Sequence, residues 1–137
     1  MKVPLPANIE KQTDLDHSLL IKRTDGIIEL RCGDAVNYTT KMVMENHAVL
    51  KEFAGSQKAL VLTFAGQYTL VSANARSYTA KGPHKDYVAA EAFLINSLPQ
   101  KLLGNFFLKV NKPVVPANVF LIADQAKAEQ WLRKHKT

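Results

Sequence analysis

Ser18-Leu19-Leu20-Ile21-Lys22-Arg23-Thr24-Asp25-Gly26-Ile27-Ile28-Glu29-Leu30-Arg31-Cys32 contains two β-rich segments on either side of Thr24-Asp25-Gly26. Asp-Gly between two such segments is a strong hairpin signal, because both residues tolerate positive φ. In the second segment Ile28, Leu30 and Cys32 alternate with Glu29 and Arg31, so we expect one face of this strand to meet water. The stretch predicts an antiparallel hairpin at the start of the fold.

Beyond the hairpin, helical and strand patterns alternate. Met42, Val43, Val49, Leu50 and Phe53 share one helical stripe, with Asn37 or Thr39 as the cap and Gly55 at the end. The unbroken apolar run Ala59–Phe64 predicts a strand covered on both faces. The pattern then predicts helices over 72–80, 96–110 and after the cap residue Asp124, and strands over 87–95 and 118–122. This order predicts an α/β fold with four helices and a mixed, largely parallel sheet.

Length and composition indicate one globular domain. The chain has 137 residues, of which 47% are hydrophobic, and no apolar run approaches the ~20 residues that span a bilayer. Residues 1–16, with Pro4 and Pro6, are expected to form an N-terminal extension, and residues 17–137 a single domain. No signal-peptide pattern opens the chain, so a cytoplasmic location without a membrane span is expected.

The net charge of +6 is unevenly distributed. Residues 1–57 hold seven Lys/Arg and eight Asp/Glu, whereas residues 58–137 hold eleven and four. The basic residues are mostly scattered, and only Arg133-Lys134-His135-Lys136 forms a run. This pattern favours a solvated surface over a nucleic-acid site.

Residues for chemistry are sparse. The four histidines fall in four different predicted elements, no phosphate-binding or nucleophile motif occurs, and the lone Cys32 is expected to be a small buried hydrophobe. We therefore expect no catalytic residue, no metal and no cofactor. Glu91 is unusual inside an apolar run: either it faces solvent at a strand end, or it is buried with a raised pKa.

A second stretch, Asn96-Ser97-Leu98-Pro99-Gln100-Lys101-Leu102-Leu103-Gly104-Asn105-Phe106-Phe107-Leu108-Lys109-Val110-Asn111-Lys112-Pro113, predicts one amphipathic helix. Its apolar stripe consists of Leu98, Leu102, Leu103, Phe106, Phe107 and Val110. Such a stripe normally packs on the sheet as core. If it is wider than the sheet can cover, the remainder would be a docking or self-association surface.

Three parts of the chain carry a resemblance to a known family: the stretch Asn96–Pro113, the later Val119-Phe120, and the closing Asp124, Ala128 and Trp131-Leu132. On these residues, the segment 18–135 resembles the STAS/SEC14-type proteins of SpoIIAA-like fold, a group of small bacterial proteins. The resemblance implies a STAS-type sheet and a non-enzymatic regulatory or protein-interaction domain. In the wider superfamily a phosphorylated Ser lies in an Asp-Ser-Ser-Gly motif. Here the corresponding stretch is Val71-Ser72-Ala73-Asn74, where only Ser72 matches.

The predicted interaction face lies at the start of the helix after the central strand. It consists of Ser72, Asn74, Arg76 and Ser77, at the carboxyl end of that strand, where open α/β sheets tend to bind ligands. Ser72 is also suited to cap the helix, and the two roles are compatible. We expect a protein partner, with self-association as a further option. The alternative function is binding of a small ligand or a lipid in the manner of SEC14 proteins.

Overall fold

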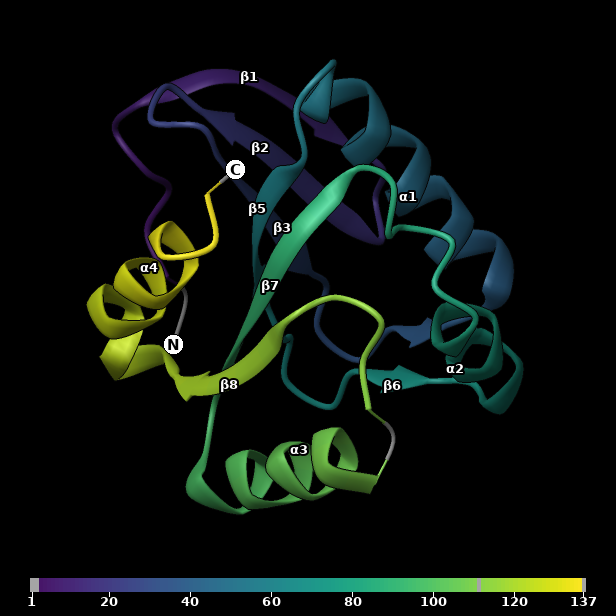
Figure 1. Cartoon of the computed structure of the whole chain (residues 1–137). Coiled ribbons are helices and arrows are strands. Elements are labelled where there is room, and N and C mark those ends of the chain that lie inside the picture. Colours follow the sequence, from purple (N-terminus) through teal and green to yellow (C-terminus); the bar gives the residue numbers. More distant parts are fainter. Residues whose placement is uncertain (1–2, 111, 137) are drawn as a thin grey trace.

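The computed structural model describes residues 3–110 and 112–136 and shows an α/β fold built on a mixed six-stranded sheet (Figure 1). The strand order is β1-β2-β3-β5-β7-β8. The first two pairs are antiparallel and the other three are parallel. The strands of this sheet are β1 (Ile9–Asp14), β2 (Ser18–Arg23), β3 (Ile27–Cys32), β5 (Ala59–Phe64), β7 (Val88–Ile95) and β8 (Ala117–Leu121).

Four helices connect or follow these strands in the described residues. They are α1 (Thr40–Ala54), α2 (Ala73–Ala80), α3 (Leu98–Val110) and α4 (Gln125–Arg133), with a short 3-10 turn, Ile122–Asp124, before α4. The predicted α/β class, the mixed sheet and the four helices are therefore confirmed. Thr39, one of the two proposed caps, caps α1 by accepting from the Met42 N–H at 3.3 Å. Asp124 stands at the start of α4 but forms no side-chain cap bond.

Strands β2 and β3 form the predicted hairpin, with Leu20 opposite Leu30. Its turn contains Gly26 at φ 92°, a conformation in which a side chain would be strained. The expectation that Glu29 faces water is wrong, since Glu29 is only 1% exposed. This side of β3 lies under the layer that contains α4, where arginines pair with the buried carboxylate.

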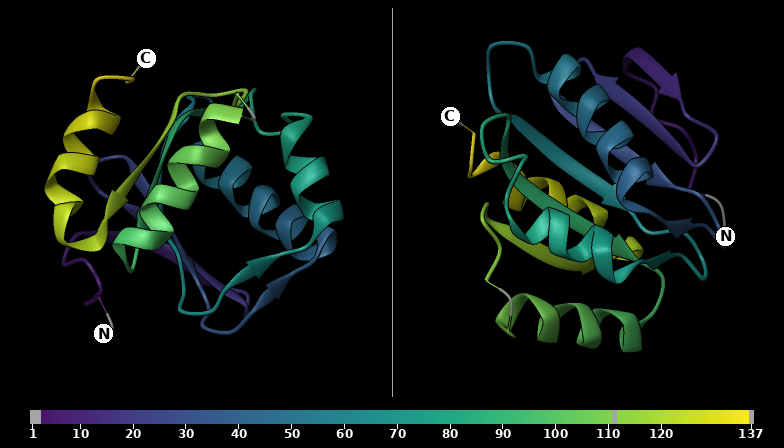
Figure 2. Two further views of the ribbon diagram at one scale, coloured as in Figure 1. Left: turned by 90° about the horizontal axis from the view of Figure 1, so that it is seen from below. Right: turned by 90° about the vertical axis from the view of Figure 1, so that its right-hand side faces the viewer.

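Both faces of the central strands are buried. All six residues of β5 are buried, as its unbroken apolar run predicted. On one face Val49, Leu50 and Phe53 of α1 pack against Val61, and on the other Ala128 and Leu132 of α4 pack against Leu62. The two turned views show α1 and α2 on one side of the sheet and α4 on the other (Figure 2).

Helix α3 occupies a different position from the one expected. It lies beside the edge strand β8, and a Cβ on Gly104 would be only 3.2 Å from the Val119 side chain. The prediction that its apolar stripe is core is wrong for four members, which are 56–62% exposed: Leu98, Leu102, Leu103 and Phe106. The side chains of Phe107 and Val110, also assigned to the stripe, lie outside the described part, as does Asn111.

Three strands were not predicted. β1, within the expected N-terminal extension, pairs with β2 as the outer strand of the sheet. β4 (Asn37–Tyr38) and β6 (Leu70–Val71) form a separate two-stranded parallel ribbon. Because β4 and β6 have only two residues each, no periodicity could show them. The ribbon matters because it precedes α2 directly and so extends the predicted interaction face.

Candidate functional site

The four residues of the predicted interaction face all lie at the start of α2. Asn74, Arg76 and Ser77 are exposed and Ser72 is half-buried. Ser72 caps the helix, with its Oγ accepting from the Ala75 N–H at 3.1 Å. The guanidinium of Arg76 donates to the Val71 carbonyl at 2.7 Å, which holds the side chain back toward the ribbon. All four residues thus fall at the start of α2, and three of them are open to solvent.

Three apolar side chains in the segment that leads into α2 are also exposed, and the sequence pattern did not indicate them. Tyr68 is 82% exposed, Leu70 65% and Val71 40%, all in or beside β6. Large apolar side chains so exposed on a short ribbon do not contribute to a core. We call the six exposed residues Tyr68, Leu70, Val71, Asn74, Arg76 and Ser77, together with Ser72, the α2 surface. For its three apolar members, the sequence signal was the presence of large apolar residues in a short connection.

The ribbon behind the α2 surface is firmly anchored. Tyr38 of β4 is 3% exposed, and its hydroxyl donates to the His17 carbonyl and also bonds Ser18 Oγ at 2.8 Å and the Gly33 N–H at 3.2 Å. Burial raises the pKa of Tyr38 to about 12, so the hydroxyl remains protonated at neutral pH. The Leu70 N–H donates to the carbonyl of Val36, the residue before β4, and the Ser72 N–H donates to the carbonyl of Tyr38 in β4. The surface is therefore presented on a fixed backbone.

A second feature is a cleft of about 680 Å³ at the carboxyl ends of β3 and β5. Its walls carry Ser18, Arg31, Asp34, Gln67 and Asn96 beside the apolar Phe64 and Ile122. Some of the polar groups are already bonded within the protein. Asp34 Oδ1 accepts from the Gln67 N–H at 2.9 Å, and Asn96 Nδ2 donates to the Ala65 carbonyl at 3.2 Å. The cleft is thus lined by polar and apolar groups together, and it lies next to the start of α3 rather than underneath this helix.

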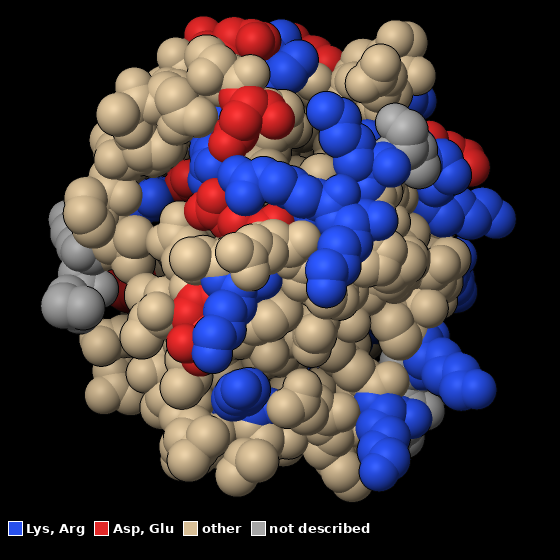
Figure 3. Space-filling view, turned by 60° about the vertical axis from the view of Figure 1, so that its left-hand side comes forward, with Lys and Arg blue, Asp and Glu red and all other residues tan. Residues whose placement is uncertain are grey.

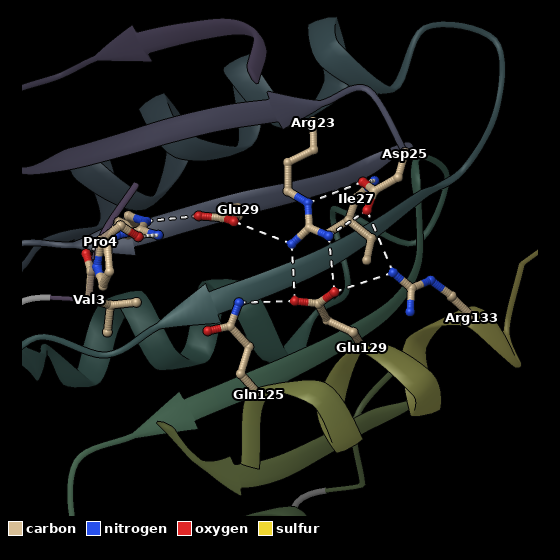
Figure 4. Close-up of polar contacts among 10 residues, drawn as sticks. Val3, Pro4, Arg23, Asp25, Ile27, Glu29, Gln125, Glu129 and Arg133 are labelled. Carbon is tan, nitrogen blue, oxygen red and sulfur yellow. Dashed lines mark hydrogen bonds and ion pairs between the residues drawn. The ribbon is translucent and has the colours of Figure 1, made fainter. Parts of the chain in front are cut away.

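A buried charge network links the hairpin to α4 (Figure 4). The Arg23 guanidinium, 6% exposed, contacts both oxygens of Glu129 at 3.0 and 3.1 Å, Glu29 at 3.4 Å, and Asp25. Hydrogen bonds from Arg23 lower the pKa of Glu129. Burial acts to raise the pKa of Asp25, but hydrogen bonds from Arg23 and the Ile27 N–H lower it overall. Because each charge has a partner, we assign the network a structural role.

Arg31 belongs to the same layer. It bonds Glu29 Oε1 at 2.8 Å and donates to the carbonyls of Val3 at 2.7 Å and Pro4 at 2.9 Å. The arginine therefore fixes the N-terminal segment to β3, beside the cleft that this segment helps to line.

Two histidines from different elements meet between α1 and the segment before β7. The ring centroids of His47 and His84 are 5.3 Å apart, and each ring has a buried Nδ1 atom without a partner. Burial, together with the charge of His84, lowers the pKa of His47 to about 4, and burial also lowers the pKa of His84. Both rings are neutral at pH 7. The sequence could not show this pair, because the residues are 37 positions apart.

The structure decides between the two alternatives that the sequence left open for Glu91. It lies in the middle of β7, is half-buried, and its Oε2 accepts from the Thr63 hydroxyl at 2.8 Å. Burial raises the pKa of its carboxyl to about 7, despite the opposing effect of this hydrogen bond. Glu91 therefore does not face solvent at a strand end; it lies half-buried in mid-strand with a raised pKa, which is closer to the second alternative.

Most of the chain matches one known protein family. Residues 20–136 match the family described as a domain of unknown function, DUF7793. The chain belongs to the DUF7793 family. No curated protein and no solved structure matches it.

Three further observations bear on the chemistry of this DUF7793 domain. Burial raises the pKa of Cys32 to about 11, which makes its thiol a poor nucleophile. Among residues 3–110 and 112–136, no group of three His, Cys, Asp or Glu side chains is placed to hold a metal ion. No helix in the same residues is long and apolar enough to cross a bilayer.

Proposed function

We propose that this DUF7793 domain is a non-enzymatic regulatory or protein-interaction domain of SpoIIAA-like type that binds a partner protein through the α2 surface. The observation that carries the proposal is the exposure of Tyr68, Leu70 and Val71 in the segment that leads into α2, together with that of Asn74, Arg76 and Ser77 at the start of the helix. Exposed apolar side chains combined with polar and arginine residues are typical of a protein interface.

The anchoring of the ribbon supports the proposal energetically. Binding loses free energy when loops and side chains must be ordered. Here the Tyr38 bonds and the Thr69 hydroxyl, which donates to the Gly33 carbonyl at 2.7 Å, already fix the segment that carries Tyr68 and Leu70. A partner would therefore meet a preorganised surface.

Ser72 supplies a test of the regulatory part of the proposal. Its Oγ accepts the cap bond of α2, and Asp is an equally good capping residue. Ser72→Asp should therefore keep the helix while adding a negative charge to the α2 surface. This separates a charge effect on binding from loss of structure.

The experiment is affinity capture from the lysate of the native host, followed by titration with the purified candidate. The variants are wild type, Leu70→Asp, Ser72→Asp and the control Met44→Asp, since Met44 is 51% exposed on α1. We expect one protein to bind wild type and Met44→Asp stoichiometrically, at least ten-fold more tightly than Leu70→Asp. Equal binding by all four forms, or no stoichiometric partner, would contradict the proposal.

The cleft favours a second candidate, binding of a small molecule. Its volume of about 680 Å³ lies within the range of roughly 300–1,000 Å³ for ligand pockets, and its position suits an open α/β sheet. Its walls combine polar side chains with the apolar Leu19, Phe64 and Ile122, which suits a small molecule that has both polar and apolar groups. Native mass spectrometry of the purified protein tests this candidate, with Leu19→Trp to fill the cleft. A molecule that co-purifies with wild type but not with the variant would support it.

A further inference from the structure

Helix α3 presents its apolar side to the solvent. Leu98, Leu102, Leu103 and Phe106 are 58, 62, 56 and 60% exposed. The opposite side, with Gly104 against Val119 of β8, holds the helix on the sheet. In Figure 1 the helix forms the lower boundary of the molecule. A surface helix of a globular protein normally turns its apolar side to the core, so this orientation calls for an outside partner.

The chain segment that contains this helix carries charges of one sign only. From residue 92 to residue 123 the chain has three lysines, Lys101, Lys109 and Lys112, and no Asp or Glu. Lys109 and Lys112 are exposed and Lys101 is half-buried. In the lowest part of Figure 3, where α3 lies, Lys and Arg atoms are visible and Asp and Glu atoms are not. The partner of α3 is therefore expected to be anionic.

A second copy of the chain fits this surface poorly. Two α3 helices brought together would juxtapose their lysines, and α3 has no carboxylate to pair with them. Four side chains about 60% exposed form a patch of a few hundred Å², whereas a stable protein interface buries about 800 Å² on each partner. A protein groove that binds a helix encloses more than one side of that helix, whereas only the side of α3 turned away from β8 is available.

A lipid surface requires one exposed apolar side of a helix with basic residues beside it, and α3 has both. An amphipathic helix in the membrane interface places Leu and Phe at the level of the acyl chains and keeps its lysines among the headgroups. Its axis lies along the membrane surface, and one exposed side is enough. Lysines beside the apolar side add attraction to anionic headgroups, which is screened by salt.

We propose that α3 is a peripheral membrane-binding helix, which inserts Leu102, Leu103 and Phe106 into the interface of an anionic bilayer while Lys109 and Lys112 contact headgroup phosphates. With 13 residues the helix is short, so the binding is reversible. This site is separate from the α2 surface, and either proposal can fail without the other.

Co-sedimentation with vesicles tests the proposal. The full chain is mixed with vesicles of phosphatidylcholine alone, or of phosphatidylcholine with about one third phosphatidylserine, at low and at high salt. We expect at least ten-fold tighter binding to the anionic vesicles, and weakening of this binding at high salt. The double variant Leu102→Asp/Phe106→Asp should lose binding at least ten-fold, and Lys109→Glu/Lys112→Glu should lose the preference for anionic lipid.

Matched controls use exposed residues on α1, Met44→Asp for the apolar change and Lys51→Glu for the charge change. Both should bind like wild type. Because the substituted α3 side chains are exposed, circular dichroism and the melting temperature should show that all variants fold. A blue shift of fluorescence from Phe106→Trp on adding anionic vesicles, beyond that of wild type with its Trp131, would support insertion directly.

Three results would overturn the proposal. One is the absence of binding of wild type to anionic vesicles. Another is equal vesicle binding by wild type and Leu102→Asp/Phe106→Asp. The third is a dimer in solution that this double variant dissociates, because it would show that a second copy covers the helix.

Discussion

The Thr63 hydroxyl donates a 2.8 Å hydrogen bond to Oε2 of Glu91, between two neighbouring parallel strands of the central sheet. Burial raises the pKa of Glu91 to about 7, well above the 4.5 of an exposed Glu. The folded protein therefore holds the Glu91 proton more tightly than the unfolded chain does. Linkage turns this difference into a dependence of stability on pH.

Glu91→Gln should stabilise the protein at alkaline pH. Above pH 7 the folded wild type has an ionised, poorly solvated carboxylate, whereas near pH 5 the group is protonated in the folded state. The Gln variant lacks this penalty, so its gain over wild type should be larger at pH 8 than at pH 5 by on the order of 2 kcal/mol. Urea unfolding at pH 5 and at pH 8 measures this gain in stability, and Glu52→Gln, on the exposed side of α1, is the control. A gain independent of pH would contradict the raised pKa.

The His47–His84 pair should make the protein sensitive to mild acid. The pKa of His47 is about 4 in the folded protein and 6.5 in the unfolded chain. The contribution of His47 to the free energy of unfolding is therefore complete above pH 6.5 and is lost as the pH falls toward 4. We expect a loss on the order of 1 kcal/mol between pH 7.5 and 5.5, and a smaller loss in His47→Gln.

Urea unfolding of both proteins in a Glu91→Gln background measures this effect, because Glu91 shifts stability in the opposite direction over the same range. Asp25 and Glu129 have lowered pKa values and lose their contribution at more acidic pH. Identical pH dependence with and without His47 would rule the pair out as the source.

Arg23→Met should be strongly destabilising. The substitution leaves Glu129 with only the exposed Arg133 as an arginine partner and the 1% exposed Glu29 with Arg31 alone. Removing one member of a buried ion pair typically costs about 3–5 kcal/mol. Lys22→Met, at the neighbouring position, removes only an exposed pair with Glu10 and should cost less than about 1 kcal/mol. Similar losses in the two variants would show that the network contributes little.

Phe106→Ala and Phe53→Ala form a pair that tests the two kinds of apolar helix face. Phe53 of α1 is 2% exposed in the core, and Phe106 of α3 is 60% exposed. We expect a loss of about 3–5 kcal/mol for Phe53→Ala and less than about 1 kcal/mol for Phe106→Ala. Chemical denaturation of both variants measures the difference. A loss above 3 kcal/mol for Phe106→Ala would place the ring in the core and remove the basis for the α3 proposal.

Local sequence patterns predicted the elements that depend on neighbouring residues. The Asp25-Gly26 turn specified the β2–β3 hairpin, and Ser72 specified the start of α2 through its cap bond. The unbroken apolar run of β5 indicated a strand buried on both faces. These interactions span a few residues, so the signal is contained in one segment. The two-residue strands β4 and β6 had no such signal, and the exposed apolar residues Tyr68, Leu70 and Val71 were missed with them.

The sequence by itself determined the order of the main helices and strands, the α/β class and the amphipathic character of α3. Only the tertiary structure decided which side of α3 meets the sheet, because Gly104 allows close approach to Val119 and so turns Leu102 and Phe106 outward. It also brought His47 to His84 and Arg23 to Glu129, which are far apart in the chain. Amphipathicity is a property of a single helix, whereas burial and pairing depend on what packs against it.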